Sequence, residues 1–207
     1  MTTIQALIDE SPPLQAWADG TPANWAVAPE VLRFIVDHVK PGMSTLETGA
    51  GQTTIAFAIA RSSHTAITLD IGEAERIRAW CAGHQVSTDE LAFLYESSDQ
   101  ALPRGLGVPA VLDFVFIDGA HRFPFPCMDW HYTESRLRVG GVLGVDDYAM
   151  PSVRVLYDFL MGEDEWELTA VLGRTALFRR VRETVVYNDC QGQRINQLPW
   201  TPFPDNP

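Results

Sequence analysis

Acidic side chains and one histidine follow two of the apolar runs in this chain. Asp118 and His121 belong to the segment FIDGAHR, and Asp146 and Asp147 belong to the segment GVDDY. If both runs are neighbouring strands of one sheet, three carboxylates and an imidazole converge at the same edge. Carboxylates in close proximity raise one another's pKa unless a cation compensates, and oxygen-rich clusters suit Mg²⁺, Mn²⁺ or Ca²⁺. The residue types therefore predict a divalent metal held by Asp118, Asp146 and Asp147.

The expected catalytic residues at this edge are His121 and Asp118. An imidazole with an unperturbed pKa of about 6.5 suits the removal of a hydroxyl proton near neutrality, and a metal would lower the pKa of that hydroxyl. Two alternatives stay open. Successive side chains of an extended strand point to opposite faces, so Asp146 and Asp147 are both ligands only where the chain bends. Asp-Gly-x-His is also a plain loop sequence, which leaves the role of His121 as base open, and an acidic residue after the fourth strand also occurs in metal-free sites.

A second constellation is the segment TLETGAGQTT, residues 45–54. Gly49 and Gly51 lie between a predicted strand and a predicted helix, where absent side chains let a ligand approach the backbone and the helix N-terminus offers unpaired N–H groups. Asp70 follows at about the 20-residue spacing at which a carboxylate accepts hydrogen bonds from ribose hydroxyls. These features predict a nucleotide-like ligand. The alternative is that the glycines only make tight turns and that Asp70 caps the next helix.

The identity of the nucleotide depends on two further residues. Thr54 stands where the dinucleotide fingerprint has its third glycine, which weakens an NAD-dependent reductase as the interpretation. Glu47 adds a carboxylate that would repel a pyrophosphate but can orient an ammonium group. The pattern therefore favours adenosine joined to an amino acid.

Strands and helices alternate between the two constellations and beyond them. This alternation predicts a doubly wound α/β sheet whose ligands bind at the carboxyl ends of the strands. The last two runs predict an antiparallel hairpin at the sheet edge. The expected strands are STLETGA, TAITLDIG, LAFLYES, LDFVFIDGA, VLGVDDY, EWELTAVL and TALFRRV, and the expected helices are a segment from Pro29 to Val39, TTIAFAIARS, EAERIRAWCAGH, residues 128–137 and PSVRVLYDFLMG.

Four of these segments resemble the motifs of a known family. LETGAGQTT, ITLDIG, FIDGAHR and GGVLGVDDY are similar to the first, second, fourth and fifth motifs of class I S-adenosylmethionine-dependent methyltransferases, over roughly residues 28–181. The resemblance implies a Rossmann-like sheet of seven strands with the last one antiparallel, and S-adenosylmethionine as cofactor. It also implies the cofactor contacts: Glu47, Gly49 and Gly51 at the methionine part, Asp70 at the ribose, Ser98 or Asp99 at the adenine rim, and Thr53 and Asp118 among the remaining contacts.

The acidic segments also resemble those of metal-dependent O-methyltransferases of the catechol type and the macrolide-sugar type. In the catechol type the metal ligands are an Asp after the fourth strand and an Asp-Asn pair after the fifth. Asp118 and the pair Asp146 and Asp147 match this pattern, with Asp in place of Asn, and His121 replaces the lysine base. O-methylation of a small hydroxylated molecule, with Mg²⁺ or another divalent cation, is the function implied. A metal-independent N- or C-methyltransferase and an inactive cofactor-binding regulator remain alternatives.

Composition bounds the domain organisation, partners and location. The 207 residues predict a methyltransferase domain over 28–182, an N-terminal extension or lid over 1–27 that is no core element, and an irregular tail over 183–207. A formal charge of −12 argues against nucleic acid as a partner, and no apolar run is long enough for a membrane span. A cytoplasmic location, a small-molecule acceptor and free cysteines are expected, and a homo-oligomer is compatible with the sequence. His38, His64 and His84 are expected on surface segments.

Overall fold

The computed structural model of the chain describes residues 3–17, 19–184 and 192–197. Its centre is a seven-stranded sheet in the order β5-β4-β3-β6-β7-β9-β8. The first five of these strands run parallel, and β9 pairs antiparallel with both β7 and β8. The strands are β3 (Ser44–Thr48), β4 (Ser63–Ile67), β5 (Leu91–Leu94), β6 (Leu112–Ile117), β7 (Leu137–Val145), β8 (Trp166–Leu172) and β9 (Thr175–Arg180). The predicted α/β sheet with a C-terminal hairpin at its edge is confirmed.

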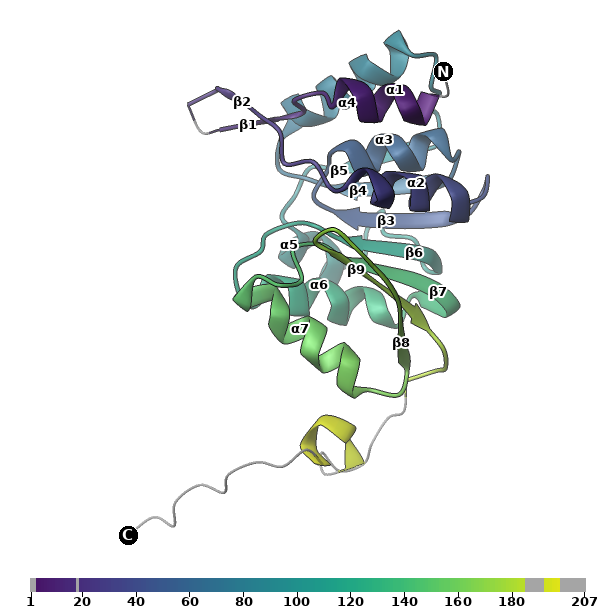
Figure 1. Cartoon of the computed structure of the whole chain (residues 1–207), viewed down its shortest axis with the longest axis vertical. Helices are drawn as coiled ribbons and strands as arrows, with labels where there is room; N and C mark the ends of the chain where they lie inside the picture. The colour runs from purple at the N-terminus through teal and green to yellow at the C-terminus, as the bar shows by residue number, and fades with distance from the viewer. Residues whose placement is uncertain (1–2, 18, 185–191, 198–207) are drawn as a thin grey trace.

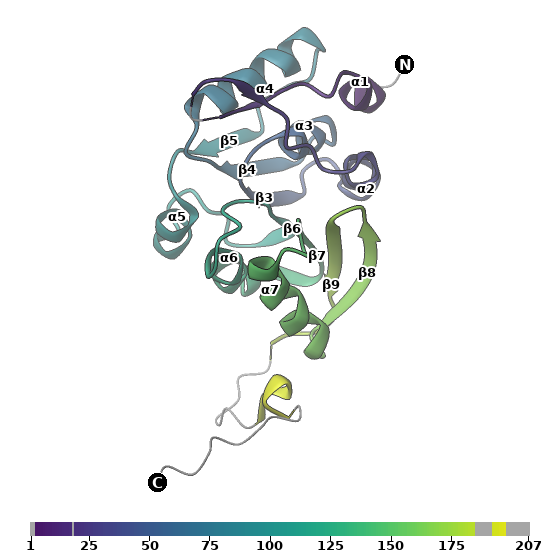
Figure 2. The same cartoon turned by 60° about the vertical axis from the view of Figure 1, so that its left-hand side comes forward.

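Helices cover both faces of the sheet, as Figures 1 and 2 show. One apolar core, which includes Ile35 and Phe57, lies under α1 to α4, and a second, which includes Leu102 and Leu156, lies under α5 to α7. Strands buried on both faces explain why β6 reads as a continuous apolar run. The helices are α1 (Thr3–Glu10), α2 (Pro29–His38), α3 (Gln52–Ile59), α4 (Ile71–Gly83), α5 (Ser98–Arg104), α6 (Phe125–Glu134) and α7 (Pro151–Gly162), with a short 3-10 helix, η2 (Arg194–Gln197).

Helix α6, strand β7 and helix α5 differ from the sequence predictions. Helix α6 begins at Phe125 instead of residue 128, with Pro126 in its first turn, where a missing N–H costs nothing. Strand β7 begins at Leu137, which was expected to end that helix, because Leu137 pairs with Leu112 of β6. The short helix α5, Ser98–Arg104, was not predicted because Pro103 interrupts its sequence pattern.

The N-terminal segment contributes to the core, which corrects the expectation that it would not. Leu7 of α1 and Leu14 are buried against α2 and α3 in the first apolar core. The chain then forms a two-stranded hairpin of β1 (Gln15–Ala16) and β2 (Pro22–Ala23), which Figure 1 shows projecting beside the carboxyl ends of the sheet strands. The predicted irregular tail over 183–207 falls mostly outside the described residues. None of the described helices has the length and apolar content needed to cross a bilayer.

Strand register determines which residues meet at the carboxyl ends. Thr48 of β3 pairs with Ile117 of β6, and Ile117 pairs with Val145 of β7. Gly49, Asp118 and Asp146 directly follow these three paired residues, so they begin the connecting loops side by side. The glycine turn and the acidic segments therefore lie at the same edge of the sheet.

Candidate active site

The glycine turn and the turn after β6 touch through their backbones. Gly49 has φ of +86°, and a β-carbon at this position would collide with the carbonyl oxygen of Asp118. The Gly49 N–H donates to the carbonyl of Ile67 at 2.9 Å, and the Asp118 N–H donates to the carbonyl of Thr48 at 3.0 Å. The turn thus requires glycine for both its left-handed backbone and its close packing. Gly51 is in extended backbone directly before α3.

Glu47 points into the protein beneath this turn. Its side chain is 1% exposed and accepts hydrogen bonds from Thr53 Oγ1 at 2.6 Å and from the Thr54 hydroxyl. His64 Nε2 lies 3.1 Å from Glu47 Oε1. These three partners occupy the carboxylate, which lines neither of the two cavities described below. Glu47 and Thr53, predicted to contact the cofactor, therefore stabilise the start of α3 from below.

The position of His64 corrects the prediction that it lies on the surface. The ring is 1% exposed and stacks on Phe57 with ring centroids 4.3 Å apart. Its Nδ1 lies 2.8 Å from Thr45 Oγ1. β4 is an interior strand between β3 and β5, so its side chains are covered even where the sequence is polar.

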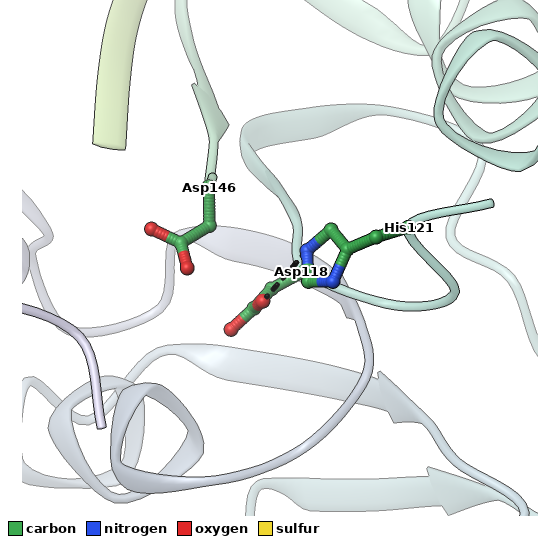
Figure 3. A group of neighbouring side chains, drawn as sticks. All are labelled: Asp118, His121 and Asp146. Carbon is green, nitrogen blue, oxygen red and sulfur yellow. Dashed lines mark ion pairs between the residues drawn. The ribbon is translucent and has the colours of Figure 1, made fainter. Parts of the chain in front are cut away.

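Asp118, His121 and Asp146 converge where β6 and β7 end (Figure 3). One potential ligand atom of each residue lies within 4.8 Å of the other two. His121 Nε2 is 3.5 Å from Asp118 Oδ1, and Asp146 accepts a hydrogen bond from Thr175 Oγ1 at 2.5 Å. The loop from Gly119 to His121 folds the imidazole back over Asp118. We call these three residues the acid cluster.

Asp147 takes a different position from the one expected for a third carboxylate ligand. Its φ of +49° turns the chain after Asp146, so that both side chains reach the same cavity. Its carboxylate pairs with Arg174 Nε at 3.0 Å and lies 4.0 Å from His121 Nε2. The bend required by the sequence is thus present, but the third member of the cluster is His121.

Proton affinities in the acid cluster are raised. Removal from water raises the pKa of Asp118 to about 7, and the nearby Asp146 contributes in the same direction. Burial likewise raises the pKa of Asp146, and the contact with Asp118 raises the pKa of His121. Two crowded carboxyl groups beside an imidazole provide the oxygen and nitrogen donors that hard and borderline divalent cations accept. The donor set therefore fits a divalent cation, whose charge would favour both carboxylates in their ionised form.

The acid cluster and the glycine turn line the same large cavity of about 860 Å³. On its other side lies the N-terminal hairpin, whose Trp17 and Trp25 rings meet edge to face with centroids 5.2 Å apart. These indoles are 56% and 52% exposed, so the cavity has an apolar wall that is open to solvent. Arg174 and Asn24 add polar groups to it.

A smaller cavity of about 180 Å³ adjoins the other side of the glycine turn. Gly49 and Gly119 line both cavities, while Thr68 and Ser98 line only the smaller one. Of the two residues predicted for the adenine rim, the structure places Ser98 here. Asp99 lines neither cavity and accepts a hydrogen bond from Ser97.

Residues 46–148 match the family model of a methyltransferase domain. The chain carries a methyltransferase domain. The matched segment runs from Leu46 in β3 to Tyr148 after β7. It contains the glycine turn, the whole acid cluster, and Gly49 and Gly119, which line both cavities. The protein is an S-adenosylmethionine-dependent methyltransferase, as its sequence motifs predicted.

Two solved structures share the fold of this methyltransferase. The O-methyltransferase TomG from Streptomyces achromogenes, involved in tomaymycin synthesis and bound to SAM, is 19% identical, covers 78% of this chain and 84% of its own, and gives a TM-score of 0.64. The O-methyltransferase from Bacillus cereus, bound to SAH, is 17% identical, covers 87% and 90%, and gives a TM-score of 0.66. At these identities the similarity establishes the architecture. No curated protein sequence gives a significant match.

Asp70, the predicted ribose partner in the methyltransferase, faces outward. Its carboxylate is 49% exposed, pairs with Arg76 at 3.0 Å and lines neither cavity. Glu73, in the first turn of α4, lines the large cavity instead and is 6% exposed. The sequence reading missed Glu73, although an acidic residue in the first turn of the helix after the second strand was a usable signal. It also missed Arg174, which only the β8-β9 hairpin brings to the cavity.

Proposed function

We propose that this methyltransferase transfers a methyl group from S-adenosylmethionine to a hydroxyl oxygen of a small molecule. In this proposal Asp118 and Asp146 hold a divalent cation, Mg²⁺ being the first candidate, with Asp147 beside them. His121 takes the proton of the acceptor hydroxyl. The observation that carries the proposal is that the acid cluster and the glycine turn line one cavity. A methyl donor on the turn and an acceptor at the cluster would then be neighbours.

The residues of the acid cluster have separable tasks in this proposal. A divalent cation, when bound, would lower the pKa of a hydroxyl that contacts it. His121 is placed on the cavity wall to accept the released proton, and the Asp118 carboxylate, 3.5 Å from Nε2, would stabilise the imidazolium. Thr175 fixes the orientation of Asp146 through its hydrogen bond. Orientation of donor and acceptor by these groups would supply much of the rate.

The remaining cavity wall supports a small organic acceptor. Trp17, Trp25 and Val27 offer apolar surface opposite the cluster, which suits the body of a molecule whose hydroxyl is at the cluster. TomG and the Bacillus cereus protein are both O-methyltransferases, which favours oxygen as the atom methylated. A formal charge of −12 opposes binding to nucleic acid.

The proposal is tested by binding and turnover on the full chain. Titration calorimetry with S-adenosylhomocysteine, with and without Mg²⁺, should show cofactor binding and a separate uptake of the cation. A panel of phenolic and sugar hydroxyl compounds, assayed with a radiolabelled methyl donor, should show transfer that stops with EDTA and resumes with Mg²⁺. Transfer that EDTA leaves unchanged would refute the metal role. Exclusive labelling of nitrogen or carbon acceptors would refute O-methylation.

A variant separates the metal role from cofactor binding. Asp146→Asn keeps the size and the hydrogen-bonding capacity toward Thr175 but removes the charge. It should abolish cation uptake and lower transfer by at least about a hundredfold, with the affinity for S-adenosylhomocysteine nearly unchanged. Asp37→Asn makes the same change at an exposed position of α2 and should behave as the unmodified protein. Equal loss of transfer and cofactor affinity in Asp146→Asn would contradict the metal hypothesis.

A further inference from the structure

Arg174 is the only lysine or arginine among the described residues that line the large cavity. It stands in the turn between β8 and β9, beyond the segment 46–148 that matches the family model, and no sequence motif assigns it a task. The carboxyl groups on the same wall belong to Glu73, Asp118, Asp146 and Asp147. A single guanidinium on an acidic wall either neutralises a neighbour or binds a ligand, and the geometry of the turn distinguishes these two tasks.

The turn between β8 and β9 holds Arg174 at the rim of the cavity. Gly173 has φ of +59°, and a β-carbon at this position would lie 2.7 Å from the β-carbon of Ala28. On the other side, the Arg174 carbonyl accepts a hydrogen bond from the Tyr148 N–H at 3.2 Å. The turn is thus packed between the segment that follows β2 and the segment that follows β7. The rim of the cavity therefore runs from the apolar wall through this turn to the acid cluster.

The ion pair with Asp147 orients the guanidinium without occupying all of it. Arg174 Nε lies 3.0 Å from Asp147 Oδ1, and within residues 3–17, 19–184 and 192–197 Arg174 forms no other ion pair. A guanidinium has five N–H donors, so one carboxylate contact leaves donors for a ligand in the cavity. The Arg174 side chain is 64% exposed, and ion pairs exposed to water contribute little to stability. Neutralisation of Asp147 alone therefore does not account for the position of Arg174.

Asp147 sets the separation between Arg174 and His121. Its Oδ1 contacts Arg174, whereas its Oδ2 lies 4.0 Å from His121 Nε2. A single carboxylate thus separates the guanidinium from the imidazole that is the proposed base. A small ring with a hydroxyl on one side and an anionic group on the other can therefore contact both residues.

The charge of the wall permits an anion at Arg174 once the site is loaded. In the proposed function a divalent cation enters the acid cluster, and its charge offsets the charges of Asp118 and Asp146. Burial raises the pKa of Glu73 to about 7, so this group carries only part of its charge near neutral pH. The remaining carboxylate, Asp147, is paired with Arg174. The loaded wall therefore does not repel an anionic group, and the guanidinium attracts it.

We propose that Arg174 determines acceptor specificity by binding a carboxylate group of the acceptor molecule. The inference rests on the proposed function, because it takes the acid cluster as the place of the acceptor hydroxyl. Such an acceptor is an aromatic hydroxy acid, whose ring packs on Trp17 and Trp25 while its hydroxyl lies at His121. A guanidinium holds a carboxylate through two parallel N–H···O bonds, so geometry as well as charge favours this group at Arg174.

The test measures the preference of the full chain for an acid over its amide. Titration calorimetry, with S-adenosylhomocysteine and Mg²⁺ at saturation, measures the affinities of 4-hydroxybenzoate, 4-hydroxyphenylacetate, 4-hydroxyphenylpropionate and the corresponding amides. The series lengthens the separation between hydroxyl and carboxylate step by step, and each amide keeps the shape of its acid without the charge. For at least one length, the unmodified protein should bind the acid about tenfold more tightly than the amide. This is the lower end of the range for hydrogen bonds to a charged group, because Arg174 is exposed to water.

Two variants and a control assign this preference to Arg174. Arg174→Gln should bring the affinities for acid and amide within about twofold of each other, with the S-adenosylhomocysteine affinity within about threefold. Arg179→Gln makes the same change in β9 of the same hairpin, where the guanidinium pairs with Glu167 and does not line the cavity, and should keep the preference. A double variant, Arg174→Gln with Asp147→Asn, also removes the carboxylate that Arg174 neutralises. It should show no preference either, because the direct partner is absent. Thermal unfolding checks that each variant is folded.

The outcomes separate this inference from the proposed function. An unmodified protein that prefers none of the acids, or an Arg174→Gln protein that keeps the preference, would overturn the inference. A preference restored in the double variant would also overturn it, because Arg174 would then act only by neutralising Asp147. Tighter binding of 4-hydroxyphenyl phosphate than of all three acids, lost in Arg174→Gln, would replace the carboxylate by a phosphate group. Acid binding without methyl transfer would overturn O-methylation alone, whereas failure to bind S-adenosylhomocysteine would overturn the proposed function and this inference with it.

Discussion

The imidazole of His64 lies 3.1 Å from the carboxylate of Glu47, and both residues are 1% exposed. This pair joins β4 to β3 directly beneath the glycine turn. Glu47 in turn accepts hydrogen bonds from the hydroxyl groups of Thr53 and Thr54 at the start of α3. A buried polar network therefore supports the turn on which the cofactor is expected to bind.

Loss of His64 should destabilise the fold. We expect His64→Leu to lower the free energy of unfolding by about 2 to 4 kcal/mol, because it removes a buried partner and leaves Glu47 with fewer hydrogen bonds. Urea denaturation measures the change. His38→Leu is the matched control, since His38 is exposed on α2, and it should change stability by less than about 1 kcal/mol. Equal stabilities of both variants would contradict the supporting role of the pair.

The glycine turn should not tolerate a side chain at position 49. Gly49→Ala adds a β-carbon that collides with the Asp118 carbonyl and forces alanine into left-handed backbone. We expect a loss of about 2 kcal/mol or more in stability and loss of detectable binding to S-adenosylhomocysteine. Gly162→Ala provides the control at the end of α7, where the added carbon meets nothing within 4 Å apart from the adjoining backbone of its own helix. A Gly49→Ala protein with normal stability would contradict the close packing of the two turns.

His121 should affect turnover more than cofactor binding. We expect His121→Ala to lower kcat by about a hundredfold to ten-thousandfold, the range for loss of a general base, with the S-adenosylhomocysteine affinity within threefold. A parallel Mn²⁺ titration distinguishes the two tasks open to this residue. Unchanged cation affinity supports the role as base, whereas a matching loss of cation affinity would make His121 a metal ligand. An unchanged kcat would remove it from the mechanism.

Asp129 of α6 should make stability depend on pH. Its carboxyl is fully buried beside Thr48 and Ser98, and burial raises its pKa to about 6. The folded protein therefore retains this proton to a higher pH than the unfolded chain, so the contribution to stability falls between about pH 4 and pH 6. Asp129→Asn removes that loss and should raise stability by on the order of 2 kcal/mol at pH 8, with little effect at pH 4. Urea denaturation at pH 4 and at pH 8 measures the change in stability, with Asp37→Asn as control. A gain in stability of the same size at the two pH values would contradict the titration of Asp129.

Much of the architecture followed from the sequence alone. The continuous apolar run of β6 and the alternation of strands with helices predicted the parallel sheet, because a strand covered on both faces needs no polar side chains. Pro151 predicted the start of α7 since it fits a first helical turn. The motifs also named the glycine turn and the cluster residues Asp118, His121 and Asp146, because residues after neighbouring parallel strands must share one edge.

Side-chain direction was decided only by the tertiary structure. Glu47 and Asp70 have the spacing of cofactor contacts, yet one points into a buried network with His64 and the other pairs with Arg76 at the surface. Spacing fixes where a residue stands along a strand or helix, but neighbours distant in sequence determine which way its side chain turns. The side chain of Glu73 faces the cavity for the same reason. Thr68 after β4 donates a hydrogen bond to its carboxyl group, and Gln15 of the N-terminal hairpin lies beside that group. Those contacts exist only after the chain has folded.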